Sequence, residues 1–222
     1  MSEIEPLIIK PQDLALRVSD LSERVVLSLM NAEEFDVIGL SDAIFLACSA
    51  VNIATEIANA HVNELYADTL EIPILGNMDT IFIRVGRESK LDIAKRTEEE
   101  EKGMILTTER DGQLVAVRRG LRMEALVTLC LIKLSKVEKL KLMAAASAIN
   151  DAVRLALQIT KGPVAKEPVA INFMSLYTIP SREDPQKKMT AISIYLEKGH
   201  KTEYSRRHQE LIKRLKIGVK IS

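Results

Sequence analysis

The sequence predicts an α/β protein of the two-layer α+β type, in which two β-α-β-α-β-β units follow one another and a further helix ends the chain. The same order of strand-like and helix-like segments occurs twice along the 222 residues. In addition, Leu14, Leu21 and Leu29 are matched by leucines 100 residues later. Such self-similarity is typical of an internal duplication. Hydrophobic residues make up 47% of the chain, enough to fill the core of one large domain or two small ones.

The first unit is predicted to span residues 1–86. Its expected elements are a strand at 13–18, a helix at 19–31, a strand at 35–40, a helix at 42–65, and two strands at 69–74 and 79–85. In the first helix, Leu21, Val25 and Leu29 recur at helical spacing. Asp20 stands in its first turn, where an acidic side chain favours a helix start.

The second unit, residues 104–200, repeats this order with a longer final hairpin. Its expected elements are a strand at 113–119, a helix at 121–135, a strand at 137–143, a helix at 147–162, and strands at 169–179 and 190–197. Its second helix can be aligned with the first unit in two ways. Residues 147–156 resemble 49–58, but the strand-to-helix spacing favours 42–48 as the counterpart, and we prefer the second alignment.

The net charge of zero conceals an asymmetry between the halves. Residues 1–100 contain 8 Lys+Arg and 19 Asp+Glu, whereas residues 101–222 contain 23 and 12. A mostly charged segment at 87–103 separates the two units and is predicted to be a linker. The opposite charges indicate that the second half meets an anion such as nucleic acid, that the halves attract each other, or both. We expect the halves to pack together about a pseudo-twofold axis, and the acidic first unit to be available to a second copy or a protein partner.

The joint between the first strand and first helix of the second unit carries Arg118, Arg119, Gly120 and Arg122. Such a joint must be exposed, and glycine allows a positive φ angle or close approach of a ligand at little steric cost. Guanidinium groups bind phosphate oxygens through two hydrogen bonds. The arginines are therefore candidate nucleic-acid contacts. The alternative is that they only keep the turn soluble or pair with the acidic half.

A second basic segment lies in the hairpin at 180–188, which carries Arg182, Lys187 and Lys188. This segment has two prolines, mixed charges and no large apolar residue to bury. We expect an exposed and mobile arm.

The C-terminal segment, residues 201–222, is predicted to form a basic amphipathic helix and tail. Tyr204, His208 and Leu211 lie on one helical stripe, and Arg206 and Arg207 lie mostly on the opposite side. We expect the helix to dock on its own domain, so its charges either form a solvated face or extend the nucleic-acid surface. His208 is predicted to be a packed residue rather than a ligand or a catalyst.

The sequence contains no pattern typical of an enzyme. It has no GxGxxG, phosphate-binding loop or GxSxG motif. Cys48 and Cys130 fall in apolar helical segments, which indicates buried thiols rather than a disulfide or a metal site. We expect no cofactor, no metal and no catalysis. With no signal-peptide pattern and no apolar run of about 18 residues, we expect a soluble, cytoplasmic protein without membrane association.

Several short stretches resemble the Alba superfamily of nucleic-acid-binding proteins. The stretch "LVAVRRG" at 114–120 looks like the family's first strand ending in a Lys-Lys-Pro turn, and "AINDAV" at 148–153 looks like the start of its second helix. In the first half, "DVIGLSDAIFLA" at 36–47 and "DTIFIRV" at 79–85 are similar to its second and last strands. The resemblance covers roughly residues 13–86 and 113–199. It implies a two-layer α/β fold, usually found as a homodimer, so that a tandem copy would form a covalent pseudo-dimer.

In this resemblance, a basic turn after the first strand meets the nucleic-acid backbone, and long hairpins embrace its sides. Arg118 and Arg119 take the place of the lysine pair and Gly120 that of the proline, while Arg182, Lys187 and Lys188 lie at the hairpin tip. The first copy departs from the pattern, because it has residues 17–19 where the basic pair is expected. Neither copy has the family's arginines at the start of the second helix. These departures imply weaker nucleic-acid binding than in a typical member.

The predicted function is therefore RNA or DNA binding without strong sequence specificity, through the basic second unit. The alternative is a non-catalytic scaffold or protein-interaction subunit that has kept the fold but no longer makes most of the contacts with nucleic acid. A small-ligand-binding domain is a third possibility, which no sequence feature favours.

Overall fold

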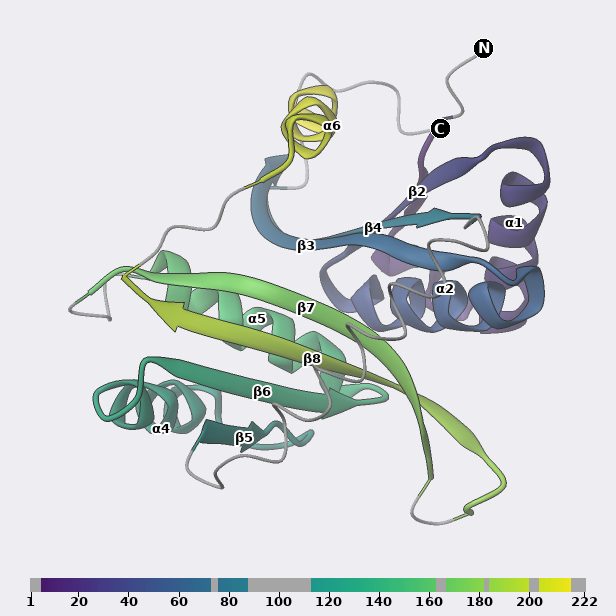
Figure 1. Ribbon diagram of the computed structural model, residues 1–222. Helices are drawn as coiled ribbons and strands as arrows, with labels where there is room; N and C mark the ends of the chain where they lie inside the picture. Colours follow the sequence, from purple (N-terminus) through teal and green to yellow (C-terminus); the bar gives the residue numbers. More distant parts are fainter. Residues whose placement is uncertain are drawn as a thin grey trace.

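The fold contains two four-stranded mixed sheets, each with two helices packed on one face (Figure 1). The computed structural model describes residues 5–72, 76–87, 113–162, 167–181, 184–199 and 204–216. The predicted linker beyond Arg87, the beginning of the second unit at 104–112, and Arg182 lie outside the described residues. An α+β protein was predicted, and the observed content agrees with that class.

The first half contains β1 (Leu7–Ile9), α1 (Val18–Asn31), β2 (Glu34–Leu40), α2 (Ile44–Ala58), β3 (His61–Ile72) and β4 (Gly76–Gly86). The second half contains β5 (Leu114–Ala116), α4 (Met123–Leu134), β6 (Lys139–Ala145), α5 (Ala148–Lys161), β7 (Val169–Pro180) and β8 (Lys188–Lys198). Helix α6 (Arg206–Lys216) follows. Two short 3-10 helices, Pro11–Ala15 and Ser41–Ala43, complete the described elements.

Both sheets have the same strand order and the same strand directions. Sheet A has the order β1-β2-β4-β3 and sheet B the order β5-β6-β8-β7. In each sheet the first pair of strands is parallel and the other two pairs are antiparallel. The carboxyl ends of β5 and β6 therefore lie at the same edge of sheet B, and the turns that follow them start from that edge.

The backbone repeats a rare conformation at the same point of each half. Ser41 and Ala146 directly follow β2 and β6, and their φ angles are 51° and 49°. A positive φ is uncommon for residues other than glycine, so this match aligns the halves at a spacing of 105 residues. The alignment pairs 42–48 with 147–153, as the strand-to-helix spacing predicted.

The first strand was predicted incorrectly. Residues 13–18 were expected to form it, but β1 lies at Leu7–Ile9 and a 3-10 helix occupies Pro11–Ala15. Leu14 and Leu16 are 50% and 42% exposed, so their alternation does not reflect a buried strand face. Proline fixes φ and offers no N–H, and Asp13 accepts a hydrogen bond from the backbone N–H of Lys10 at 2.8 Å. These features favour a tight turn over an extended strand.

The second helix was predicted to run too far. It ends at Ala58, and residues 61–65 belong to β3. Asn59 adopts a left-handed conformation with φ 49° and ends the helix. The chain can then leave α2 in the direction of β3.

The leucine match at a spacing of 100 residues also needs correction. In α1 the buried apolar positions are Leu21, Val25 and Leu29, and in α4 they are Leu126, Cys130 and Leu134, a spacing of 105 residues. Leu121 and Leu129, the partners expected at a spacing of 100, are exposed. The buried positions of α1 and α4 therefore match each other at a spacing of 105 residues and not at the predicted spacing of 100.

Helix α2 lies in a core cluster that includes residues of both halves. By length and composition alone, Ser41–Ala58 could cross a membrane, and half of this stretch is buried inside the fold. This corrects the expectation that no apolar stretch would reach that length. Such burial on several sides suits a helix with little polar surface.

Asn150 connects the beginnings of α2 and α5. Its side-chain oxygen accepts a hydrogen bond from the backbone N–H of Phe45 at 2.7 Å, and its amide nitrogen donates to the backbone carbonyl of Asp42 at 2.8 Å. One side chain of the second half thus satisfies two backbone groups of the first.

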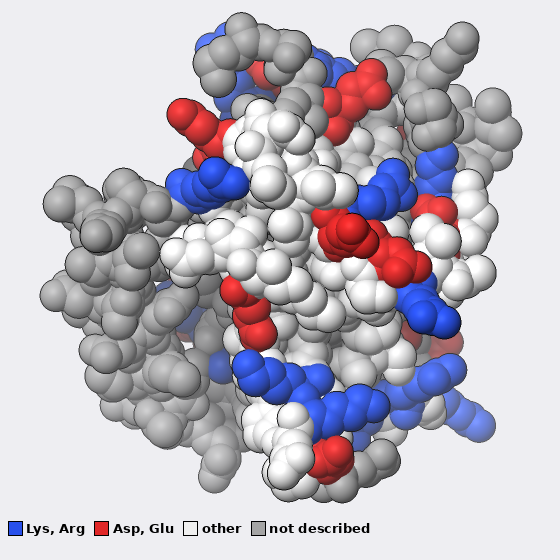
Figure 2. All heavy atoms as spheres, turned by 90° about the vertical axis from the view of Figure 1, so that its right-hand side faces the viewer, with Lys and Arg blue, Asp and Glu red and all other residues white. Residues whose placement is uncertain are grey.

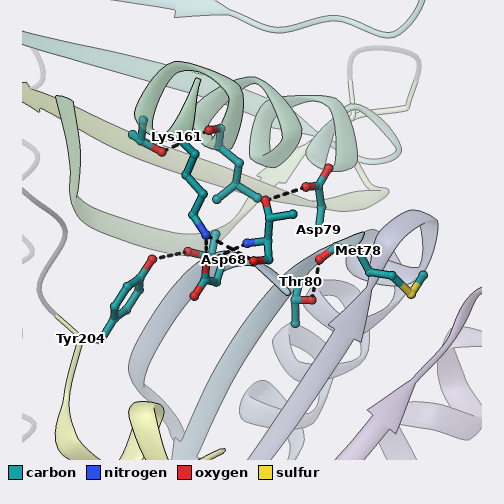
Figure 3. A network of polar contacts seen from close by, with 10 residues as sticks. Asp68, Met78, Asp79, Thr80, Lys161 and Tyr204 are labelled. Carbon is teal, nitrogen blue, oxygen red and sulfur yellow. Dashed lines mark hydrogen bonds and ion pairs between the residues drawn. The ribbon is translucent and has the colours of Figure 1, made fainter. Parts of the chain in front are cut away.

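Three basic residues of the second half form ion pairs with acidic residues of the first. They are Arg154 with Asp42 and Asp79, Lys161 with Asp68, and Lys188 with Glu56. Figure 3 shows Lys161 reaching from α5 to Asp68, whose carboxylate is largely buried. Part of the charge asymmetry between the halves is therefore used in their contact with each other.

Candidate nucleic-acid interface

The turn between β5 and α4 presents three arginines to solvent. Arg118, Arg119 and Arg122 are exposed, as are the two residues between them. The backbone N–H of Val117 donates to the carbonyl of Met143 on β6 at 2.8 Å, which fixes the beginning of the turn. At its other end, Arg122 precedes the first residue of α4. The turn thus connects two packed elements over a short distance.

Gly120 has a positive φ angle, one of the two uses of a glycine that were expected at this joint. Its φ is 86°, and a Cβ added there would meet nothing within 4 Å. Glycine is therefore required by the backbone conformation and not by lack of space. The open space around it leaves room for a ligand to approach the turn.

The three arginines make no side-chain hydrogen bond or ion pair with any residue in the described ranges. They also precede α4, whose first backbone N–H groups carry partial positive charge. This arrangement can attract and hold an anion such as a phosphate group, because the guanidinium groups have donors to offer. The alternative that the arginines pair with the acidic half has no support among the described residues.

The neighbouring turn, between β6 and α5, contributes no positive charge to this edge. It consists of Ala146 and Ser147, and the backbone N–H of Ala146 donates to the carbonyl of Thr190. In the first turn of α5, Asn150 is already bonded to the first half. Of the two turns that follow the parallel strands, only the β5–α4 turn therefore carries basic residues.

The hairpin between β7 and β8 has an exposed tip and an attached stem. Residues 184–188 are exposed, which includes the predicted contacts Lys187 and Lys188. The tip is closed by hydrogen bonds from Ser181 N–H to the carbonyl of Lys187 and from Lys187 N–H to the carbonyl of Asp184. Exposure was predicted and is observed for these residues.

The hairpin stem packs against α2 of the first half. Asn52 donates to the hydroxyl of Thr178 at 2.7 Å, and Thr178 donates to Glu56 at 3.0 Å. The ammonium of Lys188 lies 3.5 Å from Glu56. Lys188 is thus partly neutralised, whereas Lys187 forms no ion pair among the described residues.

Helix α6 lies apart from the β5–α4 turn, on the opposite side of the molecule in Figure 1. Leu211 and Leu215 pack against β2, β3 and β4 of sheet A. The helix was expected to dock on its own domain, but it lies on the sheet of the first half and not on that of the second half, which it follows in the chain. The Arg206 side chain is 95% exposed and lies 3.6 Å from Glu210. Arg207 belongs to the same helix, but its side chain lies outside the described residues. The structure therefore does not bring these arginines together with Arg118 and Arg119.

His208 lies on the buried side of α6 and is packed, as predicted. Its ring is 2% exposed and lies within 4.3–4.7 Å, between ring centroids, of three aromatic side chains, those of Tyr66, Phe82 and Tyr204. Burial, with added repulsion from Lys161 and Arg84, lowers the pKa of His208 from 6.5 to about 4. A neutral, enclosed imidazole is suited to packing and not to binding phosphate.

The first-half residue equivalent to Arg118 was predicted at the wrong position, within residues 17–19. Leu7 pairs with Val37 and Val115 pairs with Leu142, so the residues that follow β1 and β5 correspond at a spacing of 108. Lys10 therefore occupies the position of Arg118, followed by Pro11. The signal was present in "LIIKP", where apolar residues precede a Lys-Pro pair.

The distribution of charge is visible in Figure 2, which views the right-hand side of Figure 1. Lysines and arginines gather most densely in the lower part of this face, and acidic residues lie mainly above them. In Figure 1, β5 and β6 point toward this side.

Both cysteines are free and buried, as predicted. Burial raises the pKa of Cys48 far above its ordinary value and that of Cys130 to about 12. Within the described ranges, no group of three or more His, Cys, Asp or Glu residues could hold a metal ion.

No family model and no curated protein matches this chain. Among solved structures, Alba from Thermoplasma volcanium is similar at 20% sequence identity and a TM-score of 0.30, over 37% of this chain and 100% of that protein. A similarity of this strength gives no evidence of function. The described residues themselves form two four-stranded mixed sheets and five α-helices, which agrees with the predicted α+β class.

Proposed function

We propose that this protein binds RNA or DNA without strong sequence specificity, through the β5–α4 turn of its second half. The observation that carries the proposal is a difference among the basic residues of that half. Arg154, Lys161 and Lys188 are paired with acidic residues of the first half. Arg118 and Arg119 are exposed and have no such partner among the described residues.

A turn of this kind supports backbone binding without sequence readout. Phosphate contacts fix the position of a protein on nucleic acid but carry no base information. Lys187 at the β7–β8 tip would add to the same surface, and Arg182 is assigned to it from the sequence alone. Arg122 adds a third guanidinium at the turn itself.

We also propose that the chain is a covalent pseudo-dimer of two copies of one unit. Three features support this. The sheets share one strand order, Ser41 and Ala146 share a rare φ angle, and β3 and β7 each contain an irregularity, at Asn63 and Asn172. The first copy has Lys10 and Pro11 where the second copy has two adjacent arginines, so the first copy would contribute less to binding.

The scaffold alternative is favoured by one observation. Leu27 and Met30 on α1 and Leu129 and Ile132 on α4 are all exposed. Exposed apolar side chains on the outer helices suit contact with another protein. A protein that binds no nucleic acid at low salt would be assigned to this alternative.

The proposal can be tested with two matched double variants. Arg118→Ala/Arg119→Ala removes two positive charges from the turn, and Arg206→Ala/Arg207→Ala removes the same charge from α6. Binding to an RNA strand, a DNA strand and a DNA duplex would be measured by fluorescence anisotropy over a range of salt concentrations.

The turn variant should weaken binding about equally across different sequences. Its slope of log K against log salt should shrink by roughly 0.7–0.9 for each phosphate group that the variant no longer binds. The α6 variant should have a smaller effect. The turn variant should remain folded, since substitutions of exposed residues cost less than about 0.5 kcal/mol, and circular dichroism would verify the fold of both variants. Unchanged affinity and slope in the turn variant would contradict the proposal.

A further inference from the structure

The outer face of sheet B, on the side away from α4 and α5, carries a row of aromatic and basic side chains. Strand register places Lys141 of β6 opposite Tyr195 of β8, and Tyr195 opposite Phe173 of β7. The Lys141 ammonium lies 5.3 Å from the centroid of the Tyr195 ring. The rings of Tyr195 and Phe173 lie 5.8 Å apart between centroids. Phe173 is 59% exposed, an unusual position for such a large apolar side chain.

The same row of sheet A has a different composition and is covered. There, Asp36, Arg84 and Glu64 occupy the three equivalent strands. Arg84 lies 3.1 Å from Asp36 and 3.5 Å from Glu64, and these ion pairs line a small pocket together with His208 and Leu211 of α6. The chain's own helix thus occupies the outer face of the first half.

The neighbouring row of facing residues, two positions away along each strand, shows why the outer face of sheet B does not suit a similar helix. On sheet A this row is Ile38, Phe82 and Tyr66, which belong to the apolar cluster that receives Leu211 and Leu215. On sheet B the equivalent row is Met143, Ser193 and Ser175. Two small hydroxyl side chains replace two rings, so a helix with a leucine stripe would find less apolar surface. What remains at the surface is the exposed ring of Phe173, with the half-buried side chains of Tyr195 and Lys141 beside it.

This combination fits unpaired nucleotide bases. Bases of single strands stack on aromatic side chains, and a nearby cation favours their negative backbone. Duplex bases are already stacked on each other and cannot use such a surface. The row also continues to Leu114, which lies opposite Lys141 on the edge strand β5. Arg118 follows four residues later, within ~13 Å along the chain at ~3.3 Å per residue.

We propose that the outer face of sheet B binds single-stranded nucleic acid by stacking its bases on Phe173 and Tyr195, with Lys141 beside them. This rests on the proposed function and adds a preference for single strands. The strand would lie across β7, β8 and β6 towards β5, and its backbone would reach the β5–α4 turn.

The test uses the full chain and two probes, a 15-nucleotide oligo(U) strand and a 15-base-pair duplex. Phe173→Ala removes the exposed ring, and Phe173→Tyr keeps an aromatic ring in its place. Ile57→Ala is the matched control, because Ile57 is an apolar side chain of similar exposure, 66%, on α2. Binding would be followed by fluorescence anisotropy. Quenching of tyrosine fluorescence gives a second readout, since the chain has four tyrosines and no tryptophan.

Phe173→Ala should weaken oligo(U) binding about 5- to 150-fold, the range for removal of one stacked base. Duplex affinity and the salt slope should not change, because the phenyl ring carries no charge. Phe173→Tyr and Ile57→Ala should bind like the wild type, and oligo(U) should quench the tyrosine fluorescence of the wild type.

Unchanged oligo(U) binding by Phe173→Ala would overturn the proposal and leave the face to another occupant, such as a helix of a partner protein. An equal loss of affinity for strand and duplex would also overturn it. If Arg118→Ala/Arg119→Ala weakens both probes while Phe173→Ala weakens neither, the proposed function stands and the stacking face does not. If the wild type binds neither probe at low salt, both fail.

Discussion

Lowering the pH from 7 to about 4 is expected to weaken the packing of α6 on sheet A, because His208 is buried there in its neutral form. The ring is enclosed by Tyr66, Phe82 and Tyr204, and neither ring nitrogen has a hydrogen-bond partner in the described part of the chain. Protonation would place a charge among aromatic rings and close to Arg84. Burying an unpaired charge is costly.

The size and the sign of the effect follow from the pKa of His208, which is about 4 in the folded protein against 6.5 for an exposed histidine. Between these values the unfolded chain binds more protons than the folded one, so stability falls as the pH falls. Each pH unit in this window changes the unfolding free energy by up to ~1.4 kcal/mol. The full decrease between pH 6.5 and pH 4 is therefore ~3 kcal/mol.

The assay is denaturant unfolding of the wild type and of His208→Phe at several pH values from 7 to 4. Phenylalanine keeps a ring among the aromatic neighbours and cannot be protonated. The same carboxylates are present in both proteins, so their contribution to the pH dependence largely cancels in the difference. Relative to the wild type, the variant should become more stable below pH 6.5 by up to ~1.4 kcal/mol per pH unit. Parallel pH profiles for the two proteins would refute the reasoning.

Two further predictions concern the contact between the halves and the thiols. Asn150→Ala should lower the unfolding free energy by about 1–3 kcal/mol, because the backbone N–H of Phe45 loses its hydrogen-bond partner. Thermal unfolding would measure this change. The control is Asn31→Ala, which loses an exposed hydrogen bond within α1 and should change stability by less than about 0.5 kcal/mol. Cys48 and Cys130 should not react with Ellman's reagent in the native protein at pH 8, because both are buried and burial raises their pKa values. Both should react after unfolding, and rapid labelling of the native protein would contradict their burial.

Much of the fold could be predicted from periodicity. Leu21, Val25 and Leu29 recur at helical spacing and are buried in α1. The prediction failed where a strand was very short or where a helix ended through an unusual backbone conformation. β1 has three residues, too few for a periodic signal, and α2 ends at Asn59 because of its left-handed backbone.

The candidate site was partly predictable for the same reason. Strand-to-helix joints usually run over the surface, so Arg118, Arg119 and Gly120 could be placed in a turn without a structure. Lys10 was missed because its role depends on the position of β1. The aromatic row on sheet B was missed because β7 has an irregularity between Ile171 and Phe173. Simple alternation would place both on one face, yet Ile171 is buried and Phe173 is exposed.

The most direct test of the central claim is to locate the bound nucleic acid on the unaltered protein. Arginines would be modified with phenylglyoxal, with and without the 15-nucleotide strand, and the modified positions identified by mass spectrometry. We predict that the strand protects Arg118, Arg119 and Arg122, while exposed Arg206 is modified equally in both samples. Protection of Arg206 with unchanged modification of Arg118 and Arg119 would contradict the claim that the β5–α4 turn is the binding site.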